Sequence, residues 1–211
     1  MCDSIYRKEV KVDIIIKKKG AFSLKQKIFK NVLLIVSSVI LVFSFSINTF
    51  AYNLLPFSLT GGVGDWGHTR RYYWIDSSAS SSTTYISNAY SSWINTSHIL
   101  STPISWRQTT TKTDGTVEFY GYNARDGANG YTTFWRYSSS VNPRNENWGW
   151  CKVYYNYAYN AGQSTFAHEI GHTMGLDENN TNRYRIMCQA AYGRSVSSPQ
   201  YDDLAGINAK Y

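Results

Sequence analysis

The segment HEIGHTMGLDE, residues 168–178, decides the fold and chemistry expected of this 211-residue chain. It contains the pattern H-E-x-x-H. Residues four apart on an α-helix lie on one face, so His168 and His172 can bind a single ion. Glu169 lies about 100° further round the helix, where it can contact a water on that ion without being a ligand. Two neutral imidazoles, Zn²⁺ and a carboxylate base suit the hydrolysis of an amide.

The flanking residues predict where this helix begins and ends. Ser164 or Thr165 can cap its N-terminus, and Gly175 suits the left-handed residue that stops a helix. The apolar stripe on the face away from the histidines is Phe166, Ile170 and Met174. A helix that ends at Gly175 lets the chain turn back and bring residue 178 towards the ion. The alternative is an ordinary amphipathic helix whose two histidines pair with carboxylates.

The segment also resembles the signature of a known protein family. H-E-x-x-H-x-x-G-x-x followed by a third ligand is typical of metzincin zinc metalloproteases, and HEIGHTMGLD is most similar to their matrixin branch. In that family the third ligand is usually histidine, in some members aspartate, whereas here Glu178 stands at that position. The chain's two other histidines lie far outside the motif. Because His₂Glu is an established zinc set in other metalloproteases, the expected ligands are His168, His172 and Glu178, with Asp177 as the alternative to Glu178.

The resemblance covers about residues 164–211. Arg-Ile-Met-Cys, residues 185–188, falls where metzincins have a methionine-containing turn beneath the zinc site. Residues 199–211 are similar to the C-terminal helix of matrixin-type domains. The residues alone also predict this helix. Its signals are a capping Ser198, Pro199 in the first turn, Asp202 and Asp203 near the positive end, and an apolar stripe at Tyr201, Leu204, Ile207 and Tyr211.

Residues 1–51 have the composition of a secretory signal peptide. Nine basic and three acidic residues fall here, which accounts for +6 of the formal net charge of +7. An apolar run at residues 32–43 precedes Thr49-Phe50-Ala51, so we expect cleavage after Ala51. Residues 52–211 are then a secreted domain with no stable membrane association, and an uncleaved signal anchor is the alternative. Their near-neutral charge argues against a nucleic-acid partner.

Two cysteines remain after such a cleavage, Cys151 and Cys188. An even pair in a secreted domain favours a disulfide, which would tie the floor of the site to the sheet. Two free buried thiols are the alternative. Zinc ligation by these cysteines is not expected, because neither has a close partner cysteine or histidine.

Upstream of the zinc helix, hydrophobic periodicity predicts an α+β domain. The expected elements are strands at 70–76, 104–111, 116–122, 131–137 and 151–159 and a helix at 84–97. The turn signal Thr113-Asp114-Gly115 indicates a hairpin between the second and third strands. The serine tract 77–82 is expected to be a loop and helix cap, and residues 138–150 a polar loop. The order of these elements predicts a twisted mixed sheet with helices packed on one side, and the resemblance implies a metzincin-like domain.

Residues 126–130, Asp-Gly-Ala-Asn-Gly, form another predicted turn. The resemblance implies a glycine-rich calcium loop near this place, and Asp126 and Asn129 could bind Ca²⁺. A plain turn is the favoured interpretation, because Asp, Asn and Gly all suit turns. The histidines that a second, structural zinc would need are absent from the sequence.

The function expected from these patterns is that of a secreted, monomeric zinc endopeptidase acting on proteins or peptides. Its catalytic residue is Glu169, which takes a proton from a zinc-activated water and delivers it to the leaving amine. One alternative is a secreted binding module that uses the chain's 18 tyrosines and seven tryptophans as an aromatic surface. A second is a zinc-containing protein without catalysis. The sequence does not separate cleavage of proteins from cleavage of cell-wall peptide cross-links.

Overall fold

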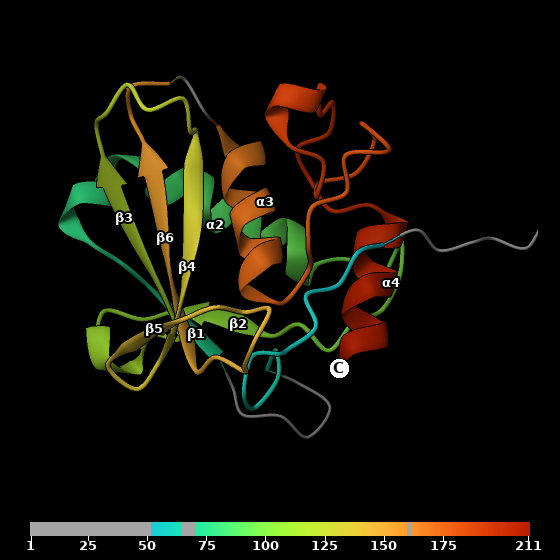
Figure 1. Cartoon of the computed structure of the whole chain (residues 1–211), viewed down its shortest axis with the longest axis horizontal. Helices are drawn as coiled ribbons and strands as arrows, with labels where there is room; N and C mark the ends of the chain where they lie inside the picture. The colour runs from blue at the N-terminus through green and yellow to red at the C-terminus, as the bar shows by residue number, and fades with distance from the viewer. Residues whose placement is uncertain (1–51, 65–70, 160–161) are drawn as a thin grey trace, which may run out of the picture. The chain divides into compact units, whose positions relative to one another are not determined.

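A mixed six-stranded β-sheet forms the centre of the fold (Figure 1). The computed structural model describes residues 52–64, 71–159 and 162–211, so the predicted leader 1–51 and His68 lie outside the described residues. In sheet order the strands are β2 (Trp106–Gln108), β1 (Arg71–Ile75), β3 (Val117–Tyr122), β6 (Trp150–Asn156), β4 (Gly130–Arg136) and β5 (Ser139–Val141). The α+β class and the mixed sheet predicted from the sequence are confirmed.

The parallel half of the sheet shows that the hairpin predicted at residues 113–115 is wrong. β2 and β3 do not pair with each other, because both run parallel to β1, which lies between them. Their connection crosses the face of β1 as a short 3₁₀ helix, η2 (Lys112–Asp114). Lys112 Nζ lies 5.0 Å from the centre of the Trp74 ring. Pairing of β1 on both edges and partial burial of Trp74 outweigh the local Asp-Gly preference for a two-strand turn.

β4 gives the sheet its antiparallel edge. It pairs with β6 from Gly130 to Trp135, but with β5 only from Phe134 to Arg136. Among the described residues, positions 130–133 therefore have no strand on their outer side. The polar loop predicted at 138–150 is partly wrong, since β5 lies within it after a turn at Tyr137, whose φ is 55°.

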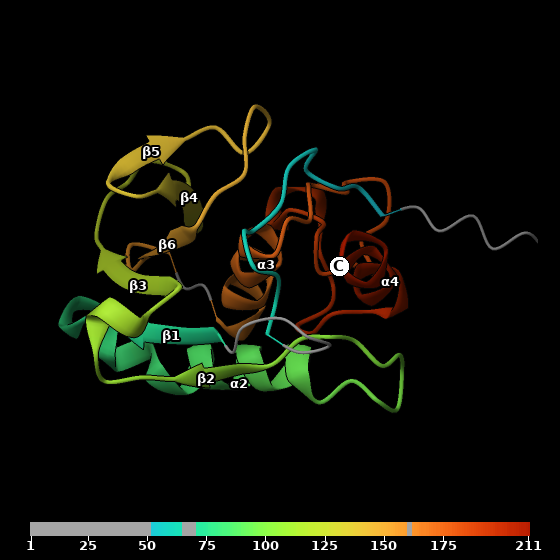
Figure 2. The same ribbon diagram turned by 90° about the horizontal axis from the view of Figure 1, so that it is seen from below.

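Two helices cover one face of the sheet. α2 (Thr83–Ile94) confirms the helix predicted at 84–97 and buries Ile86, Ala89, Tyr90 and Trp93. Figure 2, seen from below, shows α2 beside β1 and β2. The serine tract before it is a 3₁₀ helix, η1 (Ser77–Ser82), and not the expected loop, whereas its last residue, Ser82, is the N-cap residue of α2 as expected. The N-terminus of η1 is capped by the Asp76 side chain, which accepts a hydrogen bond from Ser78 N.

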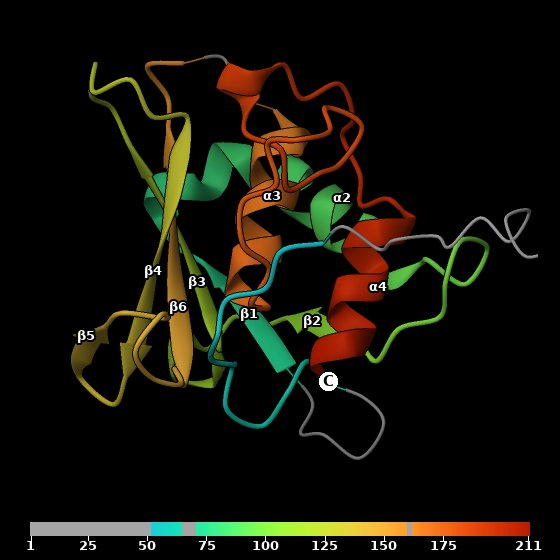
Figure 3. The same cartoon turned by 45° about the vertical axis from the view of Figure 1, so that its right-hand side comes forward.

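α3 (Gln163–Thr173) carries the H-E-x-x-H pattern and lies between the sheet and α4 (Figures 1 and 3). The predicted caps Ser164 and Thr165 are wrong: both lie inside the helix, and Gly162 is the N-cap. The predicted apolar stripe of Phe166, Ile170 and Met174 is confirmed as fully buried. Two buried tryptophans hold the helix in place, since the indole N–H of Trp93 donates to Ala167 O and that of Trp148 to Thr173 O.

α4 (Tyr201–Lys210) ends the chain and begins two residues later than its sequence signals suggest. Ser198 is not its cap. Gln200 occupies that position in a capping box with Asp203, whose carboxylate accepts a hydrogen bond from Gln200 N at 2.8 Å. Leu204 and Ile207 are fully buried as predicted, whereas Tyr201 is exposed. No helix in the described part of the chain is long and apolar enough to cross a membrane.

The predicted disulfide is wrong, because Cys151 and Cys188 are both buried free thiols. Cys151 lies in the middle of the sheet on β6, paired with Val117 and Phe134. The Cys188 thiol contacts backbone carbonyl oxygens of its own segment, 3.6 Å from Gln189 O. Burial raises the pKa of both thiols, which also disfavours their oxidation.

We expect three free thiols per full chain, Cys2 included, and no effect of reductant on stability. A bridge between Cys151 and Cys188 would contribute about 2–4 kcal/mol to the free energy of unfolding, so its reduction would lower the unfolding midpoint. The measurements are thiol titration of denatured, unreduced protein and thermal unfolding with and without dithiothreitol. A single titratable thiol together with a reductant-sensitive midpoint would contradict the structure.

Candidate metal centre

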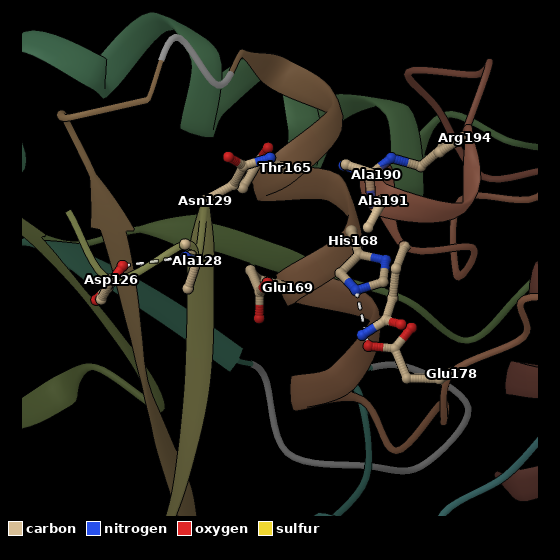
Figure 4. A pocket seen from close by; sticks show the side chains of 13 residues that line it. Asp126, Ala128, Asn129, Thr165, His168, Glu169, Glu178, Ala190, Ala191 and Arg194 are labelled. Carbon is tan, nitrogen blue, oxygen red and sulfur yellow. Dashed lines mark hydrogen bonds and ion pairs between the residues drawn. The ribbon is translucent and has the colours of Figure 1, made fainter.

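Three side chains from two segments meet at the C-terminal half of α3. The Nε2 atoms of His168 and His172 are 3.1 Å apart. Oε1 of Glu178 lies 3.4 Å from the first and 3.3 Å from the second. These are the ligand residues expected from the sequence, and Figure 4 shows His168 and Glu178 pointing towards one another.

Both imidazoles are oriented by backbone carbonyls. Nδ1 of His168 lies 2.8 Å from Ile186 O, and Nδ1 of His172 lies 2.9 Å from Leu176 O. A carbonyl oxygen can only accept, so Nδ1 must carry the proton in each ring. When a ring is neutral, it therefore presents a bare Nε2 lone pair to the centre, as ligation of a metal requires.

The turn after α3 explains how residue 178 reaches the histidines. Gly175 has a φ of 88°, which confirms the predicted left-handed stop. Gly175 N donates to His172 O and Leu176 N donates to Gly171 O, the pair of bonds that defines a Schellman motif. The chain then reverses direction, and Leu176 forms an antiparallel β-bridge with Leu54. A side chain at position 175 would collide with Lys210.

Glu178 and Asp177 point to different partners. Oδ2 of Asp177 forms a 2.6 Å ion pair with Arg144 Nη2, and its Oδ1 accepts a hydrogen bond from Glu178 N. Asn53 holds the same segment through two bonds: its carbonyl accepts from Asp177 N at 2.9 Å, and its side-chain amide donates to Glu178 O at 2.6 Å. Asp177 is thus engaged away from the histidines, and Glu178 is the carboxylate that faces them.

The predicted methionine turn lies beneath the histidines. Cys188 N donates to Arg185 O, which closes a turn around Ile186 and Met187. The buried Asp203 carboxylate of α4 accepts from Ile186 N at 3.1 Å and from Met187 N at 3.4 Å. Burial raises the pKa of Asp203, while its backbone hydrogen bonds oppose the rise. The turn packs directly on α3, because a Cβ at Gly171 would meet the Met187 sulfur at 2.3 Å.

Glu169 lies beside this centre on the sheet side of α3 and is only 6% exposed. Its Oε2 accepts a hydrogen bond from the Thr132 hydroxyl of β4 at 2.8 Å. In Figure 4 its side chain points towards β4 and not towards Glu178. One carboxylate oxygen is therefore held, and the other remains available to a substrate or a water.

His168, Glu169 and Glu178 border a cavity of about 740 Å³. One wall is the turn 126–130, the floor is α3, and the opposite wall is the segment 189–194 that follows the methionine turn. Its lining residues with polar side chains are Asp126, Asn129, Thr165, His168, Glu169, Glu178, Gln189 and Arg194. In the turn 126–130, Asp126 Oδ1 accepts from Ala128 N and Asn156 Nδ2. These bonds fit the favoured plain turn, and Ca²⁺ at Asp126 and Asn129 stays a prediction.

The donor set fits a divalent metal of the zinc type. Tetrahedral Zn²⁺ with bonds of about 2.0–2.1 Å keeps its ligand atoms roughly 3.3 Å apart, close to the three separations observed. Oε2 of Glu178 is buried without a hydrogen-bond partner among the described residues. Such an atom is costly to bury unless a cation balances the carboxylate. His168, His172 and Glu178 are the residues that would hold the ion.

The pKa values of His172 and Glu178 are shifted in opposite directions, and both shifts favour the charged form of the group. Burial tends to lower the pKa of His172, but hydrogen bonding to Glu178 and the negative charges of Glu169 and Glu178 raise it to about 9. Burial tends to raise the pKa of Glu178, but hydrogen bonds to His168 and His172 lower it to about 2. At neutral pH the site therefore holds a proton in the position that a metal would take.

Models of known protein families do not match this sequence, and a search of curated proteins finds no similar chain. The argument for the site thus depends on its own geometry. Sequence patterns missed several residues that complete it: Asn53, Thr132, Arg144, Arg194 and the turn-holding role of Asp203. Each comes from a segment distant from the motif, and no local pattern marks it.

Metal binding at this centre should release a proton. Because the pKa of His172 is about 9 without metal, its imidazole is protonated at pH 7 and must lose that proton to become a ligand. Apparent zinc affinity should rise with pH up to about 9, by at most about tenfold per pH unit, and then level off. Calorimetry in buffers of different ionisation enthalpy should give about one proton released at pH 7; a value near zero would contradict this assignment.

Asn53 should matter for metal affinity although it touches no ligand atom. Asn53→Ala removes the hydrogen bond that the Asn53 side-chain amide donates to Glu178 O, and it should weaken zinc binding about tenfold, the lower end of the effect of a supporting residue. The matched control is Asn95→Ala, which loses one exposed bond to Ser91 at the end of α2. Competition with a chromophoric chelator measures both affinities. Equal affinities for the two variants would mean that the Asn53 contact does not position Glu178.

Proposed function

We propose that this chain is a zinc-dependent endopeptidase of the metzincin type, similar to the matrixin branch. The observation that carries the proposal is the convergence of His168 Nε2, His172 Nε2 and Glu178 Oε1 within 3.4 Å, with both Nδ1 atoms committed to carbonyls. A carboxylate that is not part of the set, Glu169, borders the same cavity. A metal site alone does not need such a base, whereas hydrolysis does.

The order of elements supports the metzincin type of fold. The zinc helix, the glycine turn, the turn around Met187 and a final helix follow one another, and Asp203 joins the last two. The departure is Glu178, where the family usually has histidine. A carboxylate there keeps a three-ligand site, and His₂Glu sites catalyse the same reaction in other zinc proteases.

The chain's own residues have distinct tasks in this mechanism. His168, His172 and Glu178 would hold Zn²⁺, which would supply Lewis acidity to a water and to the scissile carbonyl. Glu169 accepts the proton of the attacking water and returns it to the leaving nitrogen. Thr132 fixes one oxygen of that carboxylate, so the other oxygen keeps a defined position for the transfer.

The free edge of β4 supports an extended peptide as substrate. Residues 130–133 border the cavity at Gly130 and lack an outer strand among the described residues. Thr132, on the same stretch, contacts Glu169. A peptide that adds to this edge as a strand would use backbone hydrogen bonds, which suit many sequences, and would run beside the general base. The substrate class we propose is accordingly a protein or peptide chain, acted on outside the cell by a monomer.

The competing function as an aromatic binding module has less support. On the outer face of the sheet the rings stack on each other, as Tyr120 does on Tyr154 at 5.5 Å and Trp135 on Trp150 at 5.2 Å. Lys152 Nζ covers the Trp135 ring at 4.3 Å. A sugar needs open ring faces, and these faces are occupied by cross-strand packing. The other alternative, a zinc-containing protein without catalysis, would have the same metal site. Only a measurement of peptide hydrolysis distinguishes it from our proposal.

Glu169→Gln should lower the rate of peptide hydrolysis by about 10²–10⁴-fold and leave bound zinc unchanged, because it removes the base but no ligand. His172→Ala should lose the metal as well as the activity. A peptide-library digest with and without a chelator, together with metal analysis, measures both effects. The control is Glu146→Gln, which removes an exposed ion pair with Arg136. Hydrolysis at the normal rate by the Glu169 variant would disprove the base, and absence of hydrolysis by zinc-loaded wild type would favour the non-catalytic alternative.

A further inference from the structure

The cavity wall opposite the turn 126–130 contains one cationic side chain, Arg194. It follows η3 (Ala190–Tyr192) and a turn at Gly193, whose φ of 82° brings the chain back towards the site. Arg194 is half-buried and lines the cavity together with Ala190 and Ala191 (Figure 4). Neither alanine side chain can form a hydrogen bond with it.

The guanidinium is anchored by one nitrogen only. Nη1 donates to Cys188 O at 3.1 Å and lies 3.5 Å from Ile186 O. Arginine has five N–H donors in a planar fork. Both hydrogen bonds of Arg194 come from Nη1, and no described residue accepts a hydrogen bond from Nε or Nη2. Anchoring through Nη1 fixes the plane of the fork while leaving one side of it for a ligand.

The positive charge has no ion-pair partner among the described residues. None of the acids that line the cavity forms an ion pair with Arg194: Oε1 of Glu178 faces the two imidazoles, Oε2 of Glu169 accepts from Thr132, and Asp126 is bonded within its own turn on the far wall. Burial lowers the pKa of Arg194, against the raising effect of Glu169, so the charge is partly stripped of water. An unpaired, partly desolvated cation in a cavity favours an anionic ligand.

We propose that Arg194 is a specificity-determining residue that binds a carboxylate of the substrate next to the scissile bond. The planar fork matches a carboxylate in a two-bond arrangement, which a lysine cannot reproduce. That carboxylate can be an Asp or Glu side chain or the free C-terminus of a peptide. The inference rests on the proposed function, because it places the carboxylate in the cavity that Glu169 borders.

The experiment compares peptides that differ only in this charge. One pair carries Glu or Gln at each position beside the scissile bond, with an amidated C-terminus. A second pair ends just beyond the scissile bond as free acid or amide. The ratio of kcat/KM within each pair is measured for wild type, Arg194→Gln and Arg194→Lys, all zinc-loaded full-length chains. A ratio within one variant does not depend on how much of that variant is folded.

We expect wild type to prefer one carboxylate-bearing peptide over its neutral partner by about 10–100-fold, the range of a charge-assisted hydrogen bond. Arg194→Gln should bring that ratio close to one, and Arg194→Lys should keep part of it. The matched control is Arg183→Gln, an exposed arginine that stacks on Tyr184 at 5.4 Å outside the cavity. The pair that shows the effect identifies the source of the carboxylate.

A binding measurement separates failure of this inference from failure of the proposed function. Glu169→Gln, alone or combined with Arg194→Gln, is titrated with the same peptides, and dissociation constants replace rates. Tighter binding of a carboxylate peptide that depends on Arg194 supports the inference even if wild type hydrolyses nothing. The inference is overturned if the ratio of kcat/KM between carboxylate and neutral peptide is near one for every pair in wild type. It is equally overturned if the ratio of dissociation constants is near one for every pair in Glu169→Gln, whether or not the chain is a peptidase.

Discussion

Two hydrogen bonds determine the geometry of the candidate metal centre: His168 Nδ1 to Ile186 O and His172 Nδ1 to Leu176 O. An imidazole has two nitrogens, so committing Nδ1 to a carbonyl fixes both the tautomer and the direction of Nε2. The helical spacing brings the rings to one face, but it does not rotate them. Both carbonyls belong to segments that follow α3, so the ligand set exists only when the chain has folded back on its own helix.

The returning segments are held by α4. The Asp203 carboxylate accepts hydrogen bonds from the backbone N–H groups of Ile186 and Met187, and it also forms the capping box of its own helix with Gln200. Asp202 pairs with Arg185 at 2.5 Å, and Lys210 donates to Leu55 O at the far end of the helix. Leu55 in turn belongs to the strand-like segment that pairs with residues 175–178. The last helix therefore braces both the turn beneath the histidines and the segment that presents Glu178.

Sequence patterns correctly predicted the features that depend on residues close together in the chain. Spacing of four placed the histidines, and the left-handed Gly175 fixed the register that turns Glu178 to the histidines and Asp177 away. The hairpin at residues 113–115 and the disulfide were wrong because each depends on a distant partner: β1 inserts between β2 and β3, and Cys151 and Cys188 have different neighbours. Thr132, 37 positions before Glu169, could not be recognised for the same reason.

Glu178 as the proposed third ligand would have an electrostatic consequence for the whole cavity. A carboxylate in place of a neutral imidazole lowers the charge of a zinc site by one unit and weakens the metal as a Lewis acid. Arg194 lies close enough to Glu169 and Glu178 for their charges to interact with its own. Arg194 therefore adds one positive charge to the cavity, on the wall and not at the proposed metal position. If the site binds zinc as proposed, the positive potential that a histidine site concentrates at its ion would here be divided between the ion and the Arg194 side chain on the cavity wall.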